Sequence, residues 1–330
     1  MENNNILTKI EPINGVDLKV TNTCNSRCEF CVNADYPGKK GDVNTKMVIR
    51  ALNQLLNSDS SLANLQNVFF TGGEPLLRLD NIIEIAKSLP RTVLLGVNTN
   101  GLILDNKKIK RLKNANIKRI KFSYDTTDKK DYLIIRKGSK EDDFDKLERN
   151  IKLAAENNFI IFWRVALGKM NYRLLNSIYQ RACSMGVDTL QIKPIVASGR
   201  AIFNKGQLSL SHNEIVETLK SLRIIIDNNK TKVSISCFPP ASNLGLTTKF
   251  CANKNKFYLD VNGNIYHCNY IQDDNNLLGN YYDVDGIKKA LIKRKKKFNR
   301  LFNNIGVISN CPALLNYLDY FGSANNLSKA

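Results

Sequence analysis

The sequence predicts an α/β protein in which parallel strands are joined by helices. Through about the first 200 residues, short β-rich runs alternate with amphipathic stretches of helical period, the pattern of consecutive βα units. After Lys193-Pro194 the alternation stops, and a long helical stretch and a hairpin signal follow. A chain of 330 residues with 43% apolar residues has room for a large core and a smaller second unit.

Six β-rich runs and five helical stretches make up the predicted first unit. The strands are expected at Val16–Thr21, Asn67–Thr71, Thr92–Asn98, Lys118–Tyr124, Ile160–Leu167 and Asp188–Lys193. The helices are expected at Thr45–Leu56, Asn81–Ser88, Asn106–Asn114, Asp143–Asn157 and Arg173–Met185. In the fourth helix, Phe144, Leu147 and Ile151 share one stripe opposite the charged residues, which predicts that this stripe lies in the core.

The remainder of the chain predicts a connecting helix and a small β-containing unit. The helix, about Ser211 to Asn228, opens with Ser-His-Asn-Glu, which has the form of a capping box. A short strand at Val233–Cys237 follows, and Asn262-Gly263 between two alternating runs, 257–261 and 264–268, predicts a hairpin. We expect an N-terminal segment at 1–14, a first domain at 15–205, a linker helix at 206–232 and a second domain at 233–330.

The sequence also indicates the cellular compartment in which the protein is found. No apolar run is long enough to span a membrane, and the N-terminus lacks the basic and then apolar pattern of a secretion signal. The protein is therefore expected in the cytoplasm, where thiols stay reduced. Eight cysteines then indicate metal binding or catalysis more than disulfides.

The formal net charge of +19 would suit an anionic partner, but a general Lys/Asn bias of composition explains it equally well. The densest basic run is Lys293–Lys297, within Lys288–Arg300. If this segment is helical, its charges point all round the axis, and no aromatic stacking motif accompanies it. Binding to nucleic acid is therefore not expected.

Cys24, Cys28 and Cys31 stand on one short segment directly after the first predicted strand. Three thiolates can hold three irons of a [4Fe–4S] cluster and leave the fourth iron open to a ligand that is not protein. The alternative is a structural zinc site, but such sites close with four ligands, and no fourth Cys or His lies nearby in the sequence.

A second motif, Thr71-Gly-Gly-Glu-Pro75, ends the second predicted strand, where α/β folds place their ligand-binding loops. Gly72 and Gly73 would let the backbone approach a ligand closely, and Glu74 would accept a hydrogen bond from an ammonium group. Taken alone, the motif could be a simple turn between strand and helix.

Together the two motifs resemble the radical S-adenosylmethionine (SAM) enzymes. Phe30, the aromatic residue before the last cysteine, fits the same signature. The resemblance covers about residues 15 to 200 and implies a partial (β/α)6 TIM barrel. It also implies that SAM chelates the open iron and that an electron, from a donor such as flavodoxin or ferredoxin, yields a 5′-deoxyadenosyl radical.

Other residues at strand ends fit the cofactor site implied by this resemblance. Asn98 and Asn100 end the third strand, in a loop that lies over SAM in the family, although Asn-Gly could also be a plain turn. Ser123 and Asp125 end the fourth strand, point to one side and could bind ribose hydroxyls, or cap the strand. Arg164 is a cation among apolar strand residues and is expected to face a carboxylate such as that of SAM.

The C-terminal cysteines Cys251, Cys268 and Cys311 resemble the ligands of SPASM domains and of their shortened form, Twitch. The resemblance implies one auxiliary [4Fe–4S] cluster; ordinary buried cysteines are the alternative. Cys237 could be a fourth ligand, which would suit substrate oxidation, or a hydrogen-atom donor, which would make the enzyme an epimerase.

The substrate is the least determined part of this interpretation. Relatives with SPASM-type domains often modify ribosomally made peptides, so cross-linking or epimerisation of a peptide is expected first. The position of Cys24 leaves little space for a leader-recognition domain before the barrel, which favours the alternative, a small molecule such as an aminoglycoside or sugar. An RNA-modifying enzyme ranks lower, since only charge supports it.

Overall fold

The structure is a computed structural model that describes residues 11–33, 41–196, 198–227, 231–236 and 255–303. Within these ranges one curved sheet of ten strands runs in the order β10-β9-β8-β1-β2-β3-β4-β5-β6-β7. The strands are β1 Ile13–Lys19, β2 Ala63–Thr71, β3 Leu94–Thr99, β4 Ile117–Ser123, β5 Ile160–Leu167, β6 Thr189–Pro194, β7 Lys232–Ile235, β8 Lys256–Leu259, β9 Asn264–Tyr266 and β10 Leu277–Asn280.

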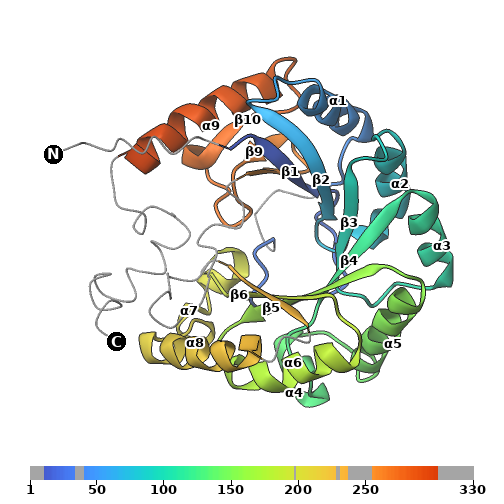
Figure 1. The fold of residues 1–330 in the computed structure, drawn as a ribbon, viewed down its shortest axis with the longest axis vertical. Helices are drawn as coiled ribbons and strands as arrows, with labels where there is room; N and C mark the ends of the chain where they lie inside the picture. Colours follow the sequence, from blue (N-terminus) through green and yellow to red (C-terminus); the bar gives the residue numbers. More distant parts are fainter. Residues whose placement is uncertain (1–10, 34–40, 197, 228–230, 237–254, 304–330) are drawn as a thin grey trace.

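Strands β8 and β1 to β7 are parallel, and β9 and β10 add antiparallel pairs at one edge. Figure 1 shows the helices as an outer layer on the convex side of this sheet. They are α1 Thr45–Leu56, α2 Leu79–Lys87, α3 Asn106–Asn114, α4 Lys129–Ile135, α5 Asp143–Glu156, α6 Leu175–Ser184, α7 Lys205–Leu208, α8 His212–Asp227 and α9 Gly286–Asn303. The architecture is a partial barrel of βα units, as the sequence predicts.

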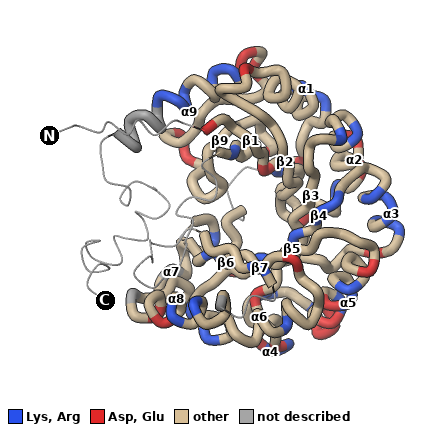
Figure 2. The backbone as a smooth tube through the Cα atoms, in the orientation of Figure 1, with Lys and Arg blue, Asp and Glu red and all other residues tan. Residues whose placement is uncertain are grey.

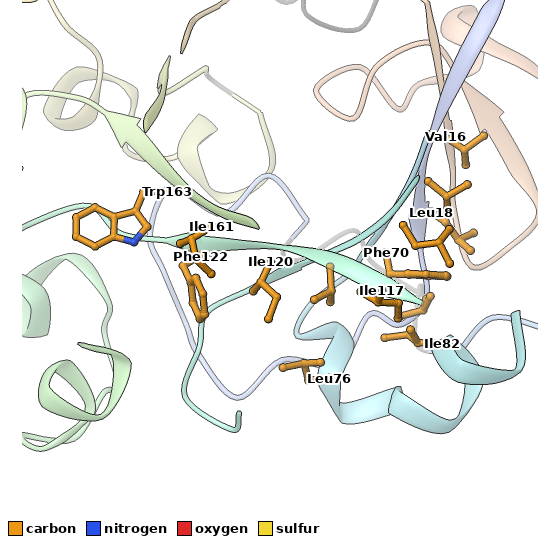
Figure 3. Close-up of a cluster of buried hydrophobic side chains, with 14 of the residues drawn as sticks. Val16, Leu18, Phe70, Leu76, Ile82, Ile117, Ile120, Phe122, Ile161 and Trp163 are labelled. Carbon is orange, nitrogen blue, oxygen red and sulfur yellow. The ribbon is translucent and has the colours of Figure 1, made fainter. Parts of the chain in front are cut away.

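Alternation along the strands separates two environments. In β4, Ile120 and Phe122 are fully buried toward the helices, whereas Lys121 and Ser123 face the concave side. Figure 3 shows the apolar layer continuing through Val16, Leu18, Phe70 and Ile82 from neighbouring strands and α2. The core therefore fills the space between sheet and helices, and polar side chains line the inside of the barrel.

The expected elements of the barrel all form, with bounds that differ by a few residues. The short elements that were not expected include the seven-residue helix α4, the four-residue helix α7 and the strand β10. The hairpin at Asn262-Gly263 also forms, as β8 and β9, but its first strand pairs with β1, so these strands extend the barrel sheet. The expected strand after α8 is β7, and Cys237 at its predicted end lies outside the described residues.

Candidate active site

The cysteine loop, residues 24–31, follows β1 and rests on the Gly-Gly turn that follows β2. Gly73 N–H donates to the Thr21 carbonyl, and Glu74 N–H donates to the Thr23 carbonyl, each over 2.8 Å. A Cβ atom on Gly73 would lie 2.1 Å from the Thr23 carbonyl oxygen. This close approach explains the glycine, since any other residue would push the two loops apart.

Desolvation raises the pKa of two thiols of this loop. It raises the pKa of Cys24 to about 11, and it also raises the pKa of Cys28. These two thiols are therefore protonated at neutral pH in the metal-free protein. Because ligation needs the thiolate, loading a cluster must release their protons.

A cavity of about 170 Å³ at the carboxyl ends of the strands collects most of the residues predicted from the sequence. Its lining includes Cys24, Cys28, Phe30, Cys31, Gly72, Gly73, Asn98, Asn100, Ser123, Asp125 and Arg164. These residues come from five separate segments of the chain and meet in one place, although their individual roles toward a ligand stay predictions.

Glu74 is part of the motif but does not line this cavity. It is fully buried, and its carboxylate accepts hydrogen bonds from Thr99 Oγ1 (2.8 Å), Asn100 N (2.8 Å) and Leu76 N (3.1 Å). Burial, only partly offset by these donors, raises the pKa of Glu74 to about 7. Through these hydrogen bonds, Glu74 connects the loop after β2 to the end of β3 and the loop that follows it.

The two asparagines at the end of β3, Asn98 within the strand and Asn100 just after it, differ in their surroundings. Asn100 Nδ2 donates to Asn25 Oδ1 (2.7 Å), which ties the loop to the cysteine segment. Asn98 Oδ1 is buried, lines the cavity and accepts no hydrogen bond from any residue that the structure describes. A buried acceptor without a donor is costly, so a ligand with an N–H or O–H group fits here.

Arg136 is a site residue that the sequence analysis missed. It follows α4, is almost fully buried, and its Nη2 lies 2.6 Å from Asp125 Oδ2, while its Nη1 lies 3.8 Å from Cys28 Sγ. Asp125 Oδ1 in turn accepts from Ala166 N over 2.9 Å. The Asp125 carboxylate is therefore held by protein groups and positions a guanidinium against a cysteine of the loop.

The loop after β6 and the hairpin segment close the cavity. Arg200 Nη1 donates to the Cys28 carbonyl, and Arg164 Nη2 donates to the Tyr270 hydroxyl (2.9 Å). Tyr270 packs with buried Cys268 and with Val196. Cys268 thus lies beside the wall of the cavity, whereas Cys237, Cys251 and Cys311 lie outside the described residues.

The types of donor in this cavity fit an iron–sulfur cluster with SAM, although among the described residues no three ligating side chains already stand close enough together to hold a metal ion. Three cysteine side chains line one cavity, glycine backbone approaches it without a Cβ atom, and a buried acceptor faces it. Residues 18–172 match the family model described as the Radical SAM superfamily. The chain has a radical SAM domain.

Relatives and solved structures resemble the chain well beyond this radical SAM domain. The GTP 3′,8-cyclase of Clostridium perfringens is 27% identical over 65% of this chain and 64% of the relative's own length. That of Limosilactobacillus fermentum is 26% identical over 84% of this chain and 85% of its own length.

Two structural matches show the same fold. Native anSMEcpe with bound AdoMet has a TM-score of 0.69 and 19% identity, covering 88% of this chain and 84% of that one. Streptococcus suis SuiB bound to precursor peptide SuiA has a TM-score of 0.66 and 14% identity, covering 97% of this chain and 74% of that one.

Among the helices in the described ranges, none combines the length and apolar character needed to cross a bilayer.

Proposed function

We propose that this protein cleaves SAM reductively and uses the resulting radical to abstract a hydrogen atom from a small-molecule substrate. The observation that carries the proposal is the convergence of Cys24, Cys28 and Cys31 with the Gly72-Gly73 backbone on one cavity of the radical SAM domain. When bound, cluster and SAM supply the electron transfer and the 5′-deoxyadenosyl radical.

In this proposal the residues of the chain bind and orient the cluster, SAM and substrate and shield them from water. The three thiolates would hold three irons of the cluster, and Gly72 and Gly73, which line the same cavity, would present backbone groups to the methionyl end of SAM. Asn98 Oδ1 would accept a hydrogen bond from SAM or substrate, and Ser123, which lines the same cavity, would bind the ribose. The Asp125–Arg136 pair places positive charge beside Cys28, which favours the reduced, more negative form of the site.

Two considerations bear on the substrate. The sequence relatives named GTP 3′,8-cyclase carry a phosphorylated small molecule in their name, and they align with up to 84% of this chain. The peptide named with SuiB supports peptide maturation only through a shared fold. We therefore place a small molecule first and keep cross-linking or epimerisation of a peptide as the second candidate.

An auxiliary [4Fe–4S] cluster bound by Cys251, Cys268 and Cys311 is part of the proposal. The position of Cys268 beside the cavity wall supports it, because a cluster there would stand near the substrate. Cys237 as a fourth ligand would suit an oxidoreductase, and a free Cys237 an epimerase. Incubation in D2O distinguishes these two roles of Cys237, since only a hydrogen donor at Cys237 leaves deuterium on one product carbon.

The test of the core proposal is SAM cleavage by the anaerobically reconstituted full chain. With dithionite as reductant, 5′-deoxyadenosine and methionine should form in equal amounts, and Cys31→Ala should abolish their formation. Gly206→Ala is the matched control, because its Cβ would meet nothing within 4 Å and the residue lies outside the cavity. Iron loading without any cleavage product would contradict the proposal and leave a non-catalytic iron–sulfur protein.

A further inference from the structure

A second chamber lies inside the barrel and shares part of its wall with the cavity at the cysteine loop. It measures about 160 Å³ and is lined by inward-facing side chains of β1 to β8 and by Asn269. Five residues line both spaces, namely Thr71, Asn98, Lys121, Arg164 and Lys193. A molecule in this inner chamber would therefore extend toward the site proposed for SAM.

The inner chamber is strongly cationic. Lys121, Arg164, Lys193 and Lys256 line it, and Asp17 is its only carboxylate among the described residues. Lys256 Nζ is 3.5 Å from Asp17 Oδ1, so this carboxylate already has one partner. The four cations together hold the pKa of Asp17 low although burial raises it.

Two of these cations lack an anionic partner among the residues that the structure describes. No carboxylate oxygen there lies within 4 Å of Lys121 Nζ or Lys193 Nζ. Lys121 Nζ stands 4.2 Å from the centroid of the Phe69 ring, in a buried position where desolvation, and then the charge of Lys256, lowers its pKa well below the ordinary value. Gathering like charges in a buried space is unfavourable unless a ligand neutralises them.

This arrangement is not the general basic character of the surface. Figure 2 shows Lys and Arg spread around the outer helices together with Asp and Glu. Inside the barrel, in contrast, the cations come from four different strands, β4, β5, β6 and β8, and their side chains converge on one small space. Oriented, desolvated cations of this kind bind phosphate oxygens far more strongly than solvated surface lysines do.

We propose that the inner chamber binds the phosphate group or groups of the substrate, with Lys193 and Lys121 as direct ligands of the anion. The inference rests on the proposed function, because it names the substrate class of that same site. With its phosphate held in the inner chamber, the remainder of the substrate extends past Asn98 and Arg164 toward the cysteine loop. The reacting carbon then lies on the SAM side, away from the charged end.

Isothermal titration calorimetry of the reconstituted full chain with inorganic tripolyphosphate tests this assignment. We expect saturable binding with one molecule per chain that weakens as salt is raised. Lys193→Gln should weaken binding by roughly tenfold or more, since a charge-assisted hydrogen bond is lost, and Lys193→Arg should retain most of it. Lys296→Gln is the matched control, because it removes an exposed charge from the densest surface run and should leave binding unchanged.

The results of this titration distinguish a phosphate group from other anions, and they do not depend on whether the protein cleaves SAM. If tripolyphosphate binds only weakly, or if Lys296→Gln weakens it as much as Lys193→Gln, surface charge explains the binding and the assignment fails. If hexaglutamate binds in a Lys193-dependent manner and tripolyphosphate does not, the chamber serves an acidic peptide and the assignment is equally wrong. SAM cleavage by the wild-type protein with dithionite tests the proposed function independently of either result.

Discussion

At the scale of single residues, the buried ion pair of Asp125 and Arg136 joins the end of β4 to the cysteine loop. Their side chains are 2% and 3% exposed, so neither charge can be solvated if the other is removed. The sequence singled out Asp125, but for ribose binding, and it missed Arg136. The contact of Arg136 with Cys28 spans 108 residues, a separation that no local motif signals.

We expect Asp125→Asn to lower the free energy of unfolding by about 3 to 5 kcal/mol, because it leaves a buried guanidinium without its partner. Asp80→Asn is the matched control, since Asp80 is largely exposed in its ion pair with Arg111 and should cost about 1 kcal/mol or less. Urea unfolding of the metal-free protein measures both. Equal losses in the two variants would show that the buried pair contributes no more than a surface pair.

Glu74 predicts a pH dependence of stability. Its pKa in the folded protein, about 7, is above the ordinary 4.5, so the folded state binds this proton more tightly than the unfolded state. The resulting stabilisation is complete below about pH 4.5 and is lost as the pH rises through 7. Relative to Glu74→Gln, the wild-type free energy of unfolding should fall by about 2 to 3 kcal/mol between pH 5 and pH 8. A difference between the two proteins that stays constant with pH would refute this.

At the scale of elements, the strands were predictable and the short helix was not. The period-two alternation of β4 and β5 marks a strand with one apolar face, and their expected bounds agree with the structure to within a residue. Helix α4 has only seven residues, Lys-Lys-Asp-Tyr-Leu-Ile-Ile, too few to show a helical period. Its N-cap Asp128, which accepts from Lys130 N and Asp131 N, was the available signal.

The contact between the Gly-Gly turn and the cysteine loop predicts a strong effect of Gly73→Ala. The added Cβ would lie 2.1 Å from the Thr23 carbonyl oxygen, so the loop must move, at a cost of about 1 to 3 kcal/mol in unfolding free energy. Iron bound after reconstitution should fall by at least half, because the three thiols no longer face one cavity. Gly206→Ala, which meets no atom within 4 Å, should keep full iron content. An unchanged iron content in Gly73→Ala would show that the cysteine loop accommodates the added Cβ atom without losing its ligands.

At the scale of the whole molecule, the sheet brings the segment that follows β7 into contact with the barrel. Strand β8 pairs with β1 across about 240 residues of sequence, and Arg50 Nη2 of α1 donates to the Tyr282 carbonyl over 2.7 Å. This places Cys268 beside the cavity wall. The division of the chain into barrel, linker and auxiliary-cluster domain stays a prediction.

The auxiliary cluster predicts how much iron the whole chain holds. The wild-type protein should bind about seven to eight irons after anaerobic reconstitution, and the triple variant Cys24→Ala, Cys28→Ala, Cys31→Ala about four. Colorimetric iron analysis with electron paramagnetic resonance of the reduced samples measures this. About four irons per wild-type chain, with none in the triple variant, would contradict the presence of an auxiliary cluster.

The βα order of the barrel and the spacing of the cysteine loop, with the cluster chemistry that it predicts, can be read from the sequence alone. Both are local properties, since the spacing of Cys24, Cys28 and Cys31 and the alternation within a strand extend over a few residues. Only the tertiary structure decided that Glu74 fastens two loops, that Arg136 contacts Cys28 and that Lys121, Lys193 and Lys256 share one chamber. These contacts arise because the sheet curves, which turns the inward faces of separate strands toward a common centre.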